Sequence, residues 1–318
     1  MRVAPDIAAL RKDRAPQLQA QAAMFAAREA WQFEAGVAQV LADLEEFGRG
    51  APLSSCLALA ELFATGEAAG QFADRFSSAF AGVLAREPLG QLPFRHGYDG
   101  VLSTLLLARS GPARLTLVAH EPGKYEASSV LFSDGARHDA VIAGEATARL
   151  TTRLVDGSFE HDRLNLAAQA RLALDLSRKA LFVERVERRL VALRLQRDAP
   201  MAGPVREFSL ADGRLLQQSA GEPRHSRHEM MVALLGRMKR REAAPLIAEI
   251  AGEAWPDTLR WQALREALAL DTAIGFAALG RIARSSLDPL AVPAGALRAQ
   301  LIEAHPELRQ FEEAQCRE

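Results

Sequence analysis

The chain has 318 residues, 49% of them hydrophobic and 25% charged, with a net charge of −1, a composition typical of a folded globular protein. It has two cysteines, Cys56 and Cys316, so neither a disulfide framework nor a cysteine-rich zinc site is expected. The N-terminus lacks the pattern of a secretory leader, and no later run approaches the roughly 20 apolar residues of a membrane span. We therefore expect a cytoplasmic protein with no membrane partner.

Helical periodicity dominates the first 90 residues. Apolar residues recur every three or four positions from about residue 17 to 47, which predicts one helix. These positions are Phe33, Val37, Val40, Leu41, Leu44 and Phe47. A second helix is predicted over Leu53 to Phe63, and a third carries Phe72, Phe76 and Phe80 on one face. The short connections predict a small bundle with this phenylalanine face in its core.

After residue 90 the period changes to two. Arg114 to Ala119, Arg149 to Leu154 and Leu172 to Leu176 alternate between the two faces of a strand. Turn signals such as Asp134–Gly135 cut the region into short segments, which favours antiparallel strands in a sandwich or barrel. The segment 179–197 has an Arg/Glu-rich start compatible with a helix, but its alternating end favours a strand.

An internal repeat follows from about residue 226. AAPLIAEIA at 243–251 matches GFAALGRIA at 275–283 with an offset of 32, and ALREAL at 263–268 matches ALRAQL at 296–301 with an offset of 33. Two helices recur in each repeat, and such pairs bury their apolar faces by stacking on their neighbours. The ALR sequences and the apolar spacing resemble HEAT-like repeats. The resemblance implies a solenoid whose concave face holds a protein partner.

Together these patterns predict an α+β fold with three domains. Residues 1–90 form a helical bundle, 91–222 an antiparallel β-sandwich or barrel of jelly-roll type, and 223–318 HEAT-like helical repeats. We expect Trp255 and Trp261 to fill gaps between the repeats.

Several motifs that would identify a reaction are absent from the sequence. It contains no GxxxxGK[ST], no GxGxxG opening a helix after a strand, no GxSxG, no HExxH and no paired CxxC. This disfavours nucleotide hydrolysis, dinucleotide redox chemistry, α/β-hydrolase chemistry and zincin proteolysis. The leading hypothesis is a non-enzymatic binding or accessory protein that holds a protein or small-molecule partner.

Histidines supply the alternative hypothesis. His96, His120, His138 and His161 all fall in the first half of the β-rich region. Imidazoles that face into a small barrel can converge on an iron, manganese or zinc ion. The stretch HDAVIAGEA at 138–146 resembles the end of the first cupin motif, where a strand runs into a Gly-Glu turn. That resemblance implies a jelly roll and a metal-dependent enzyme, and it carries over His138 alone, because the family's His-x-His pair and following glutamate are absent. The competing interpretation is four ordinary exposed histidines.

RHGYDG at 95–100 is a second candidate site, because it gathers ionisable groups beside two glycines at the junction of the helical and β-rich regions. We favour a structural turn in which Asp99 hydrogen-bonds to its own backbone.

Residues 178–241 hold 15 Lys and Arg against 7 Asp and Glu. A basic section of this kind could bind nucleic acid, which gives a second alternative function. We favour an intramolecular role or a solvated face, so a nucleic-acid partner is not expected. The oligomeric state is left open by the sequence.

Overall fold

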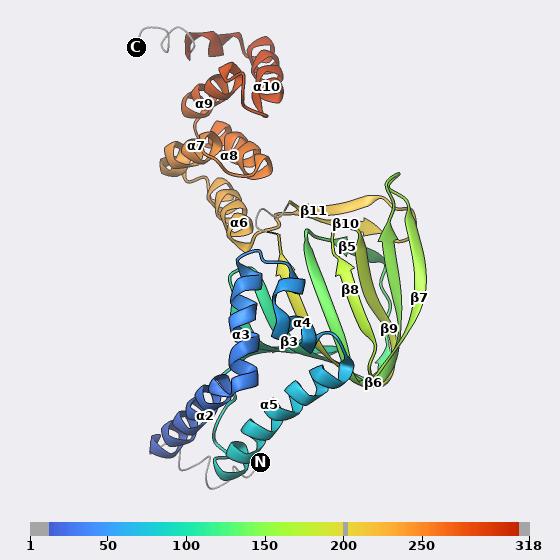
Figure 1. The fold of residues 1–318 in the computed structure, drawn as a ribbon. Helices are drawn as coiled ribbons and strands as arrows, with labels where there is room; N and C mark the ends of the chain where they lie inside the picture. The colour runs from blue at the N-terminus through green and yellow to red at the C-terminus, as the bar shows by residue number, and fades with distance from the viewer. Residues whose placement is uncertain (1–12, 200–202, 312–318) are drawn as a thin grey trace, which may run out of the picture. The chain divides into compact units, whose positions relative to one another are not determined.

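A computed structural model describes residues 13–199 and 203–311 (Figure 1). The chain divides into two compact units, Met1–Gln218 (unit 1) and Ser219–Glu318 (unit 2). The predicted boundary at residue 222 lies close to this division, whereas the one predicted at residue 90 falls inside unit 1. Among the described residues, no helix is both long enough and apolar enough to cross a membrane. Cys56 is buried and has a free thiol, and Cys316 lies outside the described residues.

The helical part of unit 1 differs from the prediction at two points: residues 17–47 form two helices, and Cys56 separates a 3-10 helix from a short α-helix within the predicted helix Leu53 to Phe63. Its helices are α2 (Ala15–Phe33), α3 (Ala35–Gly48), the 3-10 helix η1 (Leu53–Ser55), α4 (Leu57–Leu62) and α5 (Gly66–Arg86). The single helix expected over 17–47 is two, because the backbone is extended at Glu34, with φ −58° and ψ 131°. This break takes Phe33 out of the apolar face, so that its side chain is 77% exposed while Val37 is buried.

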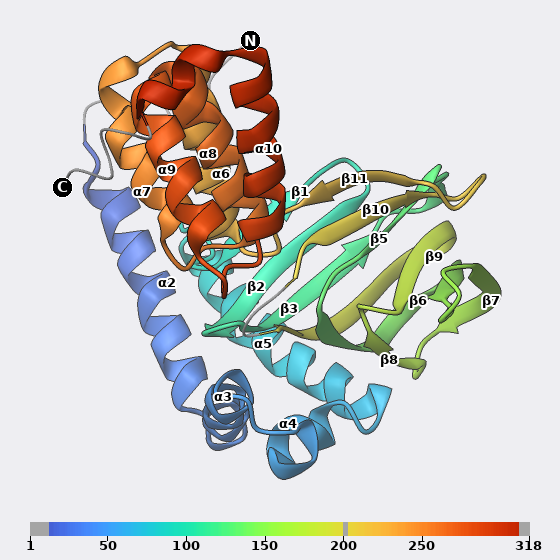
Figure 2. The same cartoon turned by 90° about the horizontal axis from the view of Figure 1, so that it is seen from above.

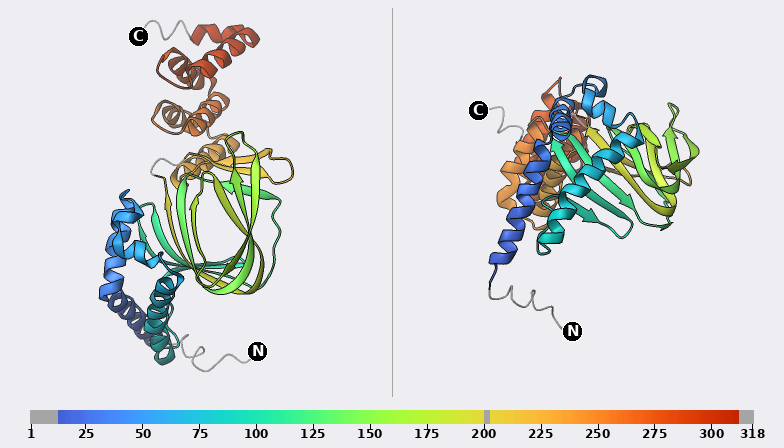
Figure 3. Two further views of the ribbon diagram at one scale, coloured as in Figure 1. Left: turned by 45° about the vertical axis from the view of Figure 1, so that its right-hand side comes forward. Right: turned by 60° about the horizontal axis from the view of Figure 1, so that its bottom comes forward.

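Two sheets form the rest of unit 1. The strands are β1 (Arg95–Tyr98), β2 (Leu102–Ser110), β3 (Ala113–His120), β4 (Gly123–Lys124), β5 (Ser129–Phe132), β6 (Gly135–Arg153), β7 (Phe159–Ala167), β8 (Arg171–Asp175), β9 (Lys179–Asp198), β10 (Val205–Ser209) and β11 (Leu215–Ser219). The larger sheet has the order β1-β2-β3-β9-β6-β7, with β4 paired to β9 and β8 to β6, and the smaller has the order β11-β10-β5. Neighbouring strands of the larger sheet are antiparallel and strongly curved (Figure 3). The predicted mixture of helix and antiparallel sheet, and the strand at 179–197, are confirmed.

The Gly-Glu turn predicted within 138–146 is not a turn. Strand β6 continues through it, with register shifts against β9 between Val141 and Ala146 that mark β-bulges. Gly144 has a φ of +94°, and a Cβ there would lie 2.1 Å from the Arg189 carbonyl oxygen. Glycine at this position therefore lets the strand bend without ending.

Helices α2 to α5 cover one face of the larger sheet (Figure 2). In the core between them, the ring of Trp31 meets those of Phe72, Phe76 and Phe80 edge to face, with centroids 5.3–6.4 Å apart. Leu193 and Leu195 of β9 reach the same core and are 0% exposed. The predicted core role of the phenylalanine face is confirmed, and the helices and the sheet share one core.

Unit 2 is helical. It contains α6 (Pro223–Arg237), η2 (Arg241–Ala243), α7 (Ala244–Gly252), α8 (Asp257–Leu270), α9 (Thr272–Arg284), α10 (Ala291–Ala304) and η3 (Pro306–Arg309). The four repeat segments fall on α7, α8, α9 and α10 in turn, as expected for two helix pairs. Trp255 and Trp261 pack against the core of this unit.

A buried arginine ties unit 2 together. Arg260 on α8 is 7% exposed, and its Nε donates to the carbonyl oxygen of Ala251 at 3.0 Å. Its two Nη atoms donate to the two carboxylate oxygens of Asp288, in the loop before α10. Asp257 adds a second carboxylate, with its Oδ1 3.5 Å from Nη1. The guanidinium thus joins three segments and is fully compensated in charge.

Candidate functional site

The larger sheet has a polar patch on the face turned away from α2 to α5, which we call the inner face. Leu193 and Leu195 point toward the helices, so strand alternation places Arg194 on the inner face. Directly opposite Arg194 lie Thr116 on β3 and Asp139 on β6. Because cross-strand partners share a face, these three side chains form a row across the sheet.

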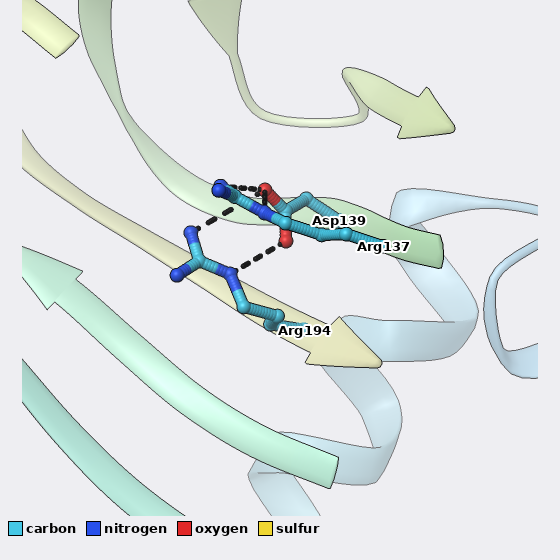
Figure 4. Close-up of polar contacts among 3 residues, drawn as sticks. All are labelled: Arg137, Asp139 and Arg194. Atoms are coloured by element: carbon cyan, nitrogen blue, oxygen red, sulfur yellow. Dashed lines mark hydrogen bonds and ion pairs between the residues drawn. The ribbon is translucent and has the colours of Figure 1, made fainter. Parts of the chain in front are cut away.

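Asp139 is the centre of a buried ion cluster (Figure 4). Its side chain is 4% exposed, and those of Arg137 and Arg194 are 15% and 18% exposed. Nε of Arg194 donates to Oδ1 at 2.8 Å, and Nε of Arg137 donates to Oδ2 at 2.8 Å. Arg137 also donates to Oδ2 through Nη2. Two guanidinium groups therefore share one carboxylate, which leaves a positive charge uncompensated within the cluster.

The arginines determine the protonation of Asp139. Burial by itself raises the pKa of this carboxyl, but attraction to Arg194 and then to Arg137, together with their hydrogen bonds, outweighs burial and lowers the pKa to about 2. Asp139 is consequently ionised at neutral pH and holds both guanidinium groups in place.

Two cavities lie beside the cluster, and Arg194 lines both. The first, of about 500 Å³, we call the arginine lobe. Its polar lining is Arg95, His96, Thr104, Arg109, Arg114, Thr116, Arg194 and Gln196. The second, of about 480 Å³, we call the aromatic lobe. Its apolar lining is Val101, Leu102, Tyr125, Leu181, Phe182 and Val183. Its polar lining is His120, Lys124, Glu126, Arg137 and Arg194.

The arginine lobe has little acidic compensation. Arg114 pairs with Asp198, with 2.8 Å between Nη2 and Oδ1, and both side chains are more than a third exposed. Within the part of the chain that the structure describes, Arg95 and Arg109 form no ion pair. Guanidinium groups bind carboxylate and phosphate through paired N–H donors. The lobe therefore has the chemistry to hold an anion.

His120 lies in the wall of the aromatic lobe. Burial lowers its pKa most, and the positive charges of Arg194 and Arg137 lower it further, to about 4. The opposing effects of Asp139 and Asp99 are smaller. The imidazole is therefore neutral at pH 7, with one ring nitrogen as donor and the other as acceptor.

The other three histidines are dispersed. His96 is exposed on the edge strand β1, where it borders the arginine lobe. His138 packs against Phe63, with 6.5 Å between ring centroids, and burial lowers its pKa. His161 is exposed on β7, with Nδ1 3.0 Å from Oγ1 of Thr151.

Strand register explains why these histidines do not converge. His138 lies opposite Leu195 and so faces the helices, whereas His120 lies on the same side of its strand as Thr116 and faces inward. Among residues 13–199 and 203–311, no group of three His, Cys, Asp or Glu side chains is placed to hold a metal ion. The structure thus does not bring the four predicted histidines together.

The turn interpretation of RHGYDG is confirmed. Oδ1 of Asp99 accepts the backbone N–H groups of Val101 and Leu102 at 2.9 and 2.8 Å, and these bonds lower its pKa. Gly100 supplies a φ of +97°. The turn ends β1, whose Arg95 side chain borders the arginine lobe.

The basic section 178–241 is divided between the two units. In unit 1 several of its arginines form ion pairs, such as that of Arg189 with Glu121 at 2.8 Å. Arg197 donates Nη1 to the carbonyl oxygens of Phe47 and Ala51, both at 2.7 Å, at the end of α3. These contacts are of the intramolecular kind that the sequence favoured.

Arg137, Asp139 and Arg194 were not predicted as a site from the sequence. Asp139 lies within residues 138–146, the stretch that resembles a cupin motif, and Arg137 precedes it by two residues. Arg194 interrupts the apolar run from Leu190 to Leu195. Charges two apart on a strand share a face, and a charge inside an apolar strand needs a partner. The two charges on one strand face, together with a charge inside an apolar strand, could have predicted this site from the sequence.

Comparisons with known proteins give a weak likeness to cupins. No family model matches the sequence, and no curated protein matches it. Among solved structures, CapF from Staphylococcus aureus has 11% identity and a TM-score of 0.29, covering 46% of this chain and 39% of its own. A cupin superfamily protein from Desulfitobacterium hafniense has 13% identity and a TM-score of 0.25, covering 32% and 83%. Vicilin from hazelnut, Corylus avellana, has 10% identity and a TM-score of 0.27, covering 36% and 32%. The chain thus spans about a third of the vicilin, and the likeness to all three is partial.

Proposed function

We propose that unit 1 binds a small organic anion on the inner face of the larger sheet. The observation that carries the proposal is the shared carboxylate: Asp139 fixes two guanidinium groups and neutralises one of them. Arg194 is thereby held rigid, and it lines both cavities. A cation whose geometry is fixed before binding loses little entropy when it meets a ligand.

The arginine lobe supplies the rest of the binding energy. Arg114 is paired with a half-exposed carboxylate, which an incoming anion can replace, and Arg95 and Arg109 are exposed. A charge-assisted hydrogen bond contributes about 1.5–3 kcal/mol when it is well formed. Two such bonds are sufficient for millimolar binding of a simple anion, since a Kd of 1 mM corresponds to about 4 kcal/mol.

Calorimetric titration with inorganic phosphate and with citrate, at constant ionic strength, tests the proposal. The wild-type protein should bind at least one of them with a Kd of about 1 mM or lower, and Arg114→Gln should weaken binding about tenfold or more. Arg188→Gln is the matched control, because Arg188 lies on the same strand as Arg194, is 76% exposed and lines neither lobe. Absence of binding by the wild type, or equal losses in the two variants, would refute an anion site here.

For unit 2 the prediction remains that it is HEAT-like and holds a protein partner. Its support is the repeat in sequence and the two helix pairs that carry it. Affinity purification of the full chain from its own cell extract at physiological salt should recover one stoichiometric protein; recovery of the chain alone would count against a partner.

A further inference from the structure

The two lobes differ in chemistry although Arg194 belongs to both. The arginine lobe is lined by Arg95, Arg109 and Arg114, whereas the aromatic lobe is lined by the rings of Tyr125 and Phe182. Charged side chains also line the aromatic lobe, but the Tyr125 and Phe182 rings lie only there, so a ligand that spans both lobes fits with its anionic group in the arginine lobe and a ring in the aromatic lobe.

Strand β3 sets the spacing of the lobes. Thr116 and Val118 line the arginine lobe, and His120, two residues after Val118 on the same face of the strand, lines the aromatic lobe. At 3.2–3.4 Å per residue, His120 is roughly 7 Å from Val118 and roughly 13 Å from Thr116. That range fits an acidic group and a ring joined by a short linker.

The rings of the aromatic lobe are positioned for contact with a ligand. Phe182 is half-buried and belongs to none of the packed apolar clusters among the described residues. The guanidinium carbon of Arg149 lies 5.9 Å from the centroid of its ring. The Tyr125 hydroxyl donates to the Glu121 carbonyl oxygen at 2.6 Å, which fixes that ring as well.

We propose that the ligand is an amphipathic organic anion, with a carboxylate or phosphate head in the arginine lobe and an aromatic ring in the aromatic lobe. This inference rests on the proposed anion-binding function and adds the second half of the ligand. His120 is neutral at physiological pH and so adds no further charge to the lining that a ring would have to desolvate.

Calorimetry with paired probes tests the two halves separately. The probes are 4-phenylbutyrate and 4-phenylbutyl phosphate, their heads alone as butyrate and inorganic phosphate, and the ring alone as 4-phenylbutanol. At least one two-part probe should bind about tenfold or more tightly than its own head, which is the gain expected from burying a phenyl ring. The better of the two identifies the head as carboxylate or phosphate.

Variants then test whether the gain in affinity from the ring arises in the aromatic lobe. Phe182→Ala should reduce the affinity of the two-part probe to that of its head, and Val101→Ser, in the same lobe but outside every core cluster, should remove part of the gain. Phe25→Ala is the control, because Phe25 is a 54% exposed ring on α2. Thermal unfolding of each variant establishes that it is folded. If an anion binds and the ring adds nothing, or if Phe182→Ala and Val101→Ser both keep the full gain in affinity, the two-part ligand is refuted and the anion site stands; if neither the heads nor citrate bind, both proposals fail.

Discussion

Each unit of this protein contains a nearly buried arginine bound to aspartate, and the two arrangements serve different ends. In unit 2, Arg260 meets Asp288, Asp257 and a backbone carbonyl, so its charge is compensated inside the unit. In unit 1, two arginines share Asp139, and Arg194 also borders two cavities. The compensated arginine is a structural tie, whereas the surplus charge beside a cavity is the feature on which we base the proposed binding site.

Removing the shared carboxylate of Asp139 should lower the stability of the protein more than any other change considered below. Asp139→Asn leaves two guanidinium groups close together and nearly buried without an anion, and we expect a loss of about 3–5 kcal/mol in the free energy of unfolding. Urea denaturation at pH 7 measures it. Asp198→Asn makes the same chemical change in the half-exposed pair with Arg114 and should cost about 1 kcal/mol or less. Similar losses in the two variants would mean that Asp139 does not hold the cluster together.

The structural tie in unit 2 should be nearly as sensitive. Arg260→Gln leaves Asp288, whose side chain is 13% exposed, without its cation, and we expect a loss of about 3 kcal/mol. Hydrogen exchange resolved by peptide should show the loss of protection in α7 to α9 and leave the sheets of unit 1 unchanged. Arg240→Gln is the control, since its pair with Glu242 is exposed. Unchanged protection in Arg260→Gln would mean that Arg260 is not a structural tie in unit 2.

Arg194→Gln separates binding from stability. Asp139 keeps Arg137 in this variant, so the expected cost is about 1 kcal/mol, well below that of Arg260→Gln. Phosphate or citrate binding should nevertheless weaken about tenfold or more, because the lost guanidinium lines both lobes. Urea denaturation and calorimetry on one preparation measure the two effects. A stability loss equal to that of Arg260→Gln, with binding intact, would make Arg194 a structural tie as well.

How far the sequence predicts this molecule depends on the range of each interaction. Period-two and helical patterns found the strand at Leu193 to Arg197 and the core face at Phe72, because both are set by burial of one side. The break at Glu34 was not predicted, and neither was the bulge at Gly144, which depends on close packing against Arg189 of a distant strand. The site escaped for the same reason: Asp139 and Arg194 are 55 residues apart, and only strand register brings them together.

We also expect a pH dependence of stability that originates in the aromatic lobe. The pKa of His120 is about 4 in the folded protein, against an ordinary value near 6.5, so between these values the unfolded chain binds a proton that the folded chain does not. Stability should therefore be complete above pH 6.5 and decrease as the pH falls toward 4. His138, whose pKa burial also lowers, contributes in the same direction. Below pH 4, protonation of Asp139 begins to release the arginines, down to its pKa of about 2.

His120→Gln should reduce the decrease in the free energy of unfolding between pH 6.5 and 4. The double variant His120→Gln with His138→Gln should reduce that decrease further. Urea denaturation at half-unit intervals of pH measures the slopes, and His161→Gln, which removes an exposed imidazole, should leave the contribution of His120 in place. An unchanged slope in His120→Gln would mean that this imidazole is protonated in the folded state, beside Arg137 and Arg194. A charged imidazole there would add to the surplus positive charge of the inner face, and binding of the anionic head would then strengthen as the pH falls through the pKa of His120. If the imidazole is neutral, the affinity for a carboxylate probe should stay constant from pH 7.5 to 5.5, because the charge of the probe itself does not change over that range.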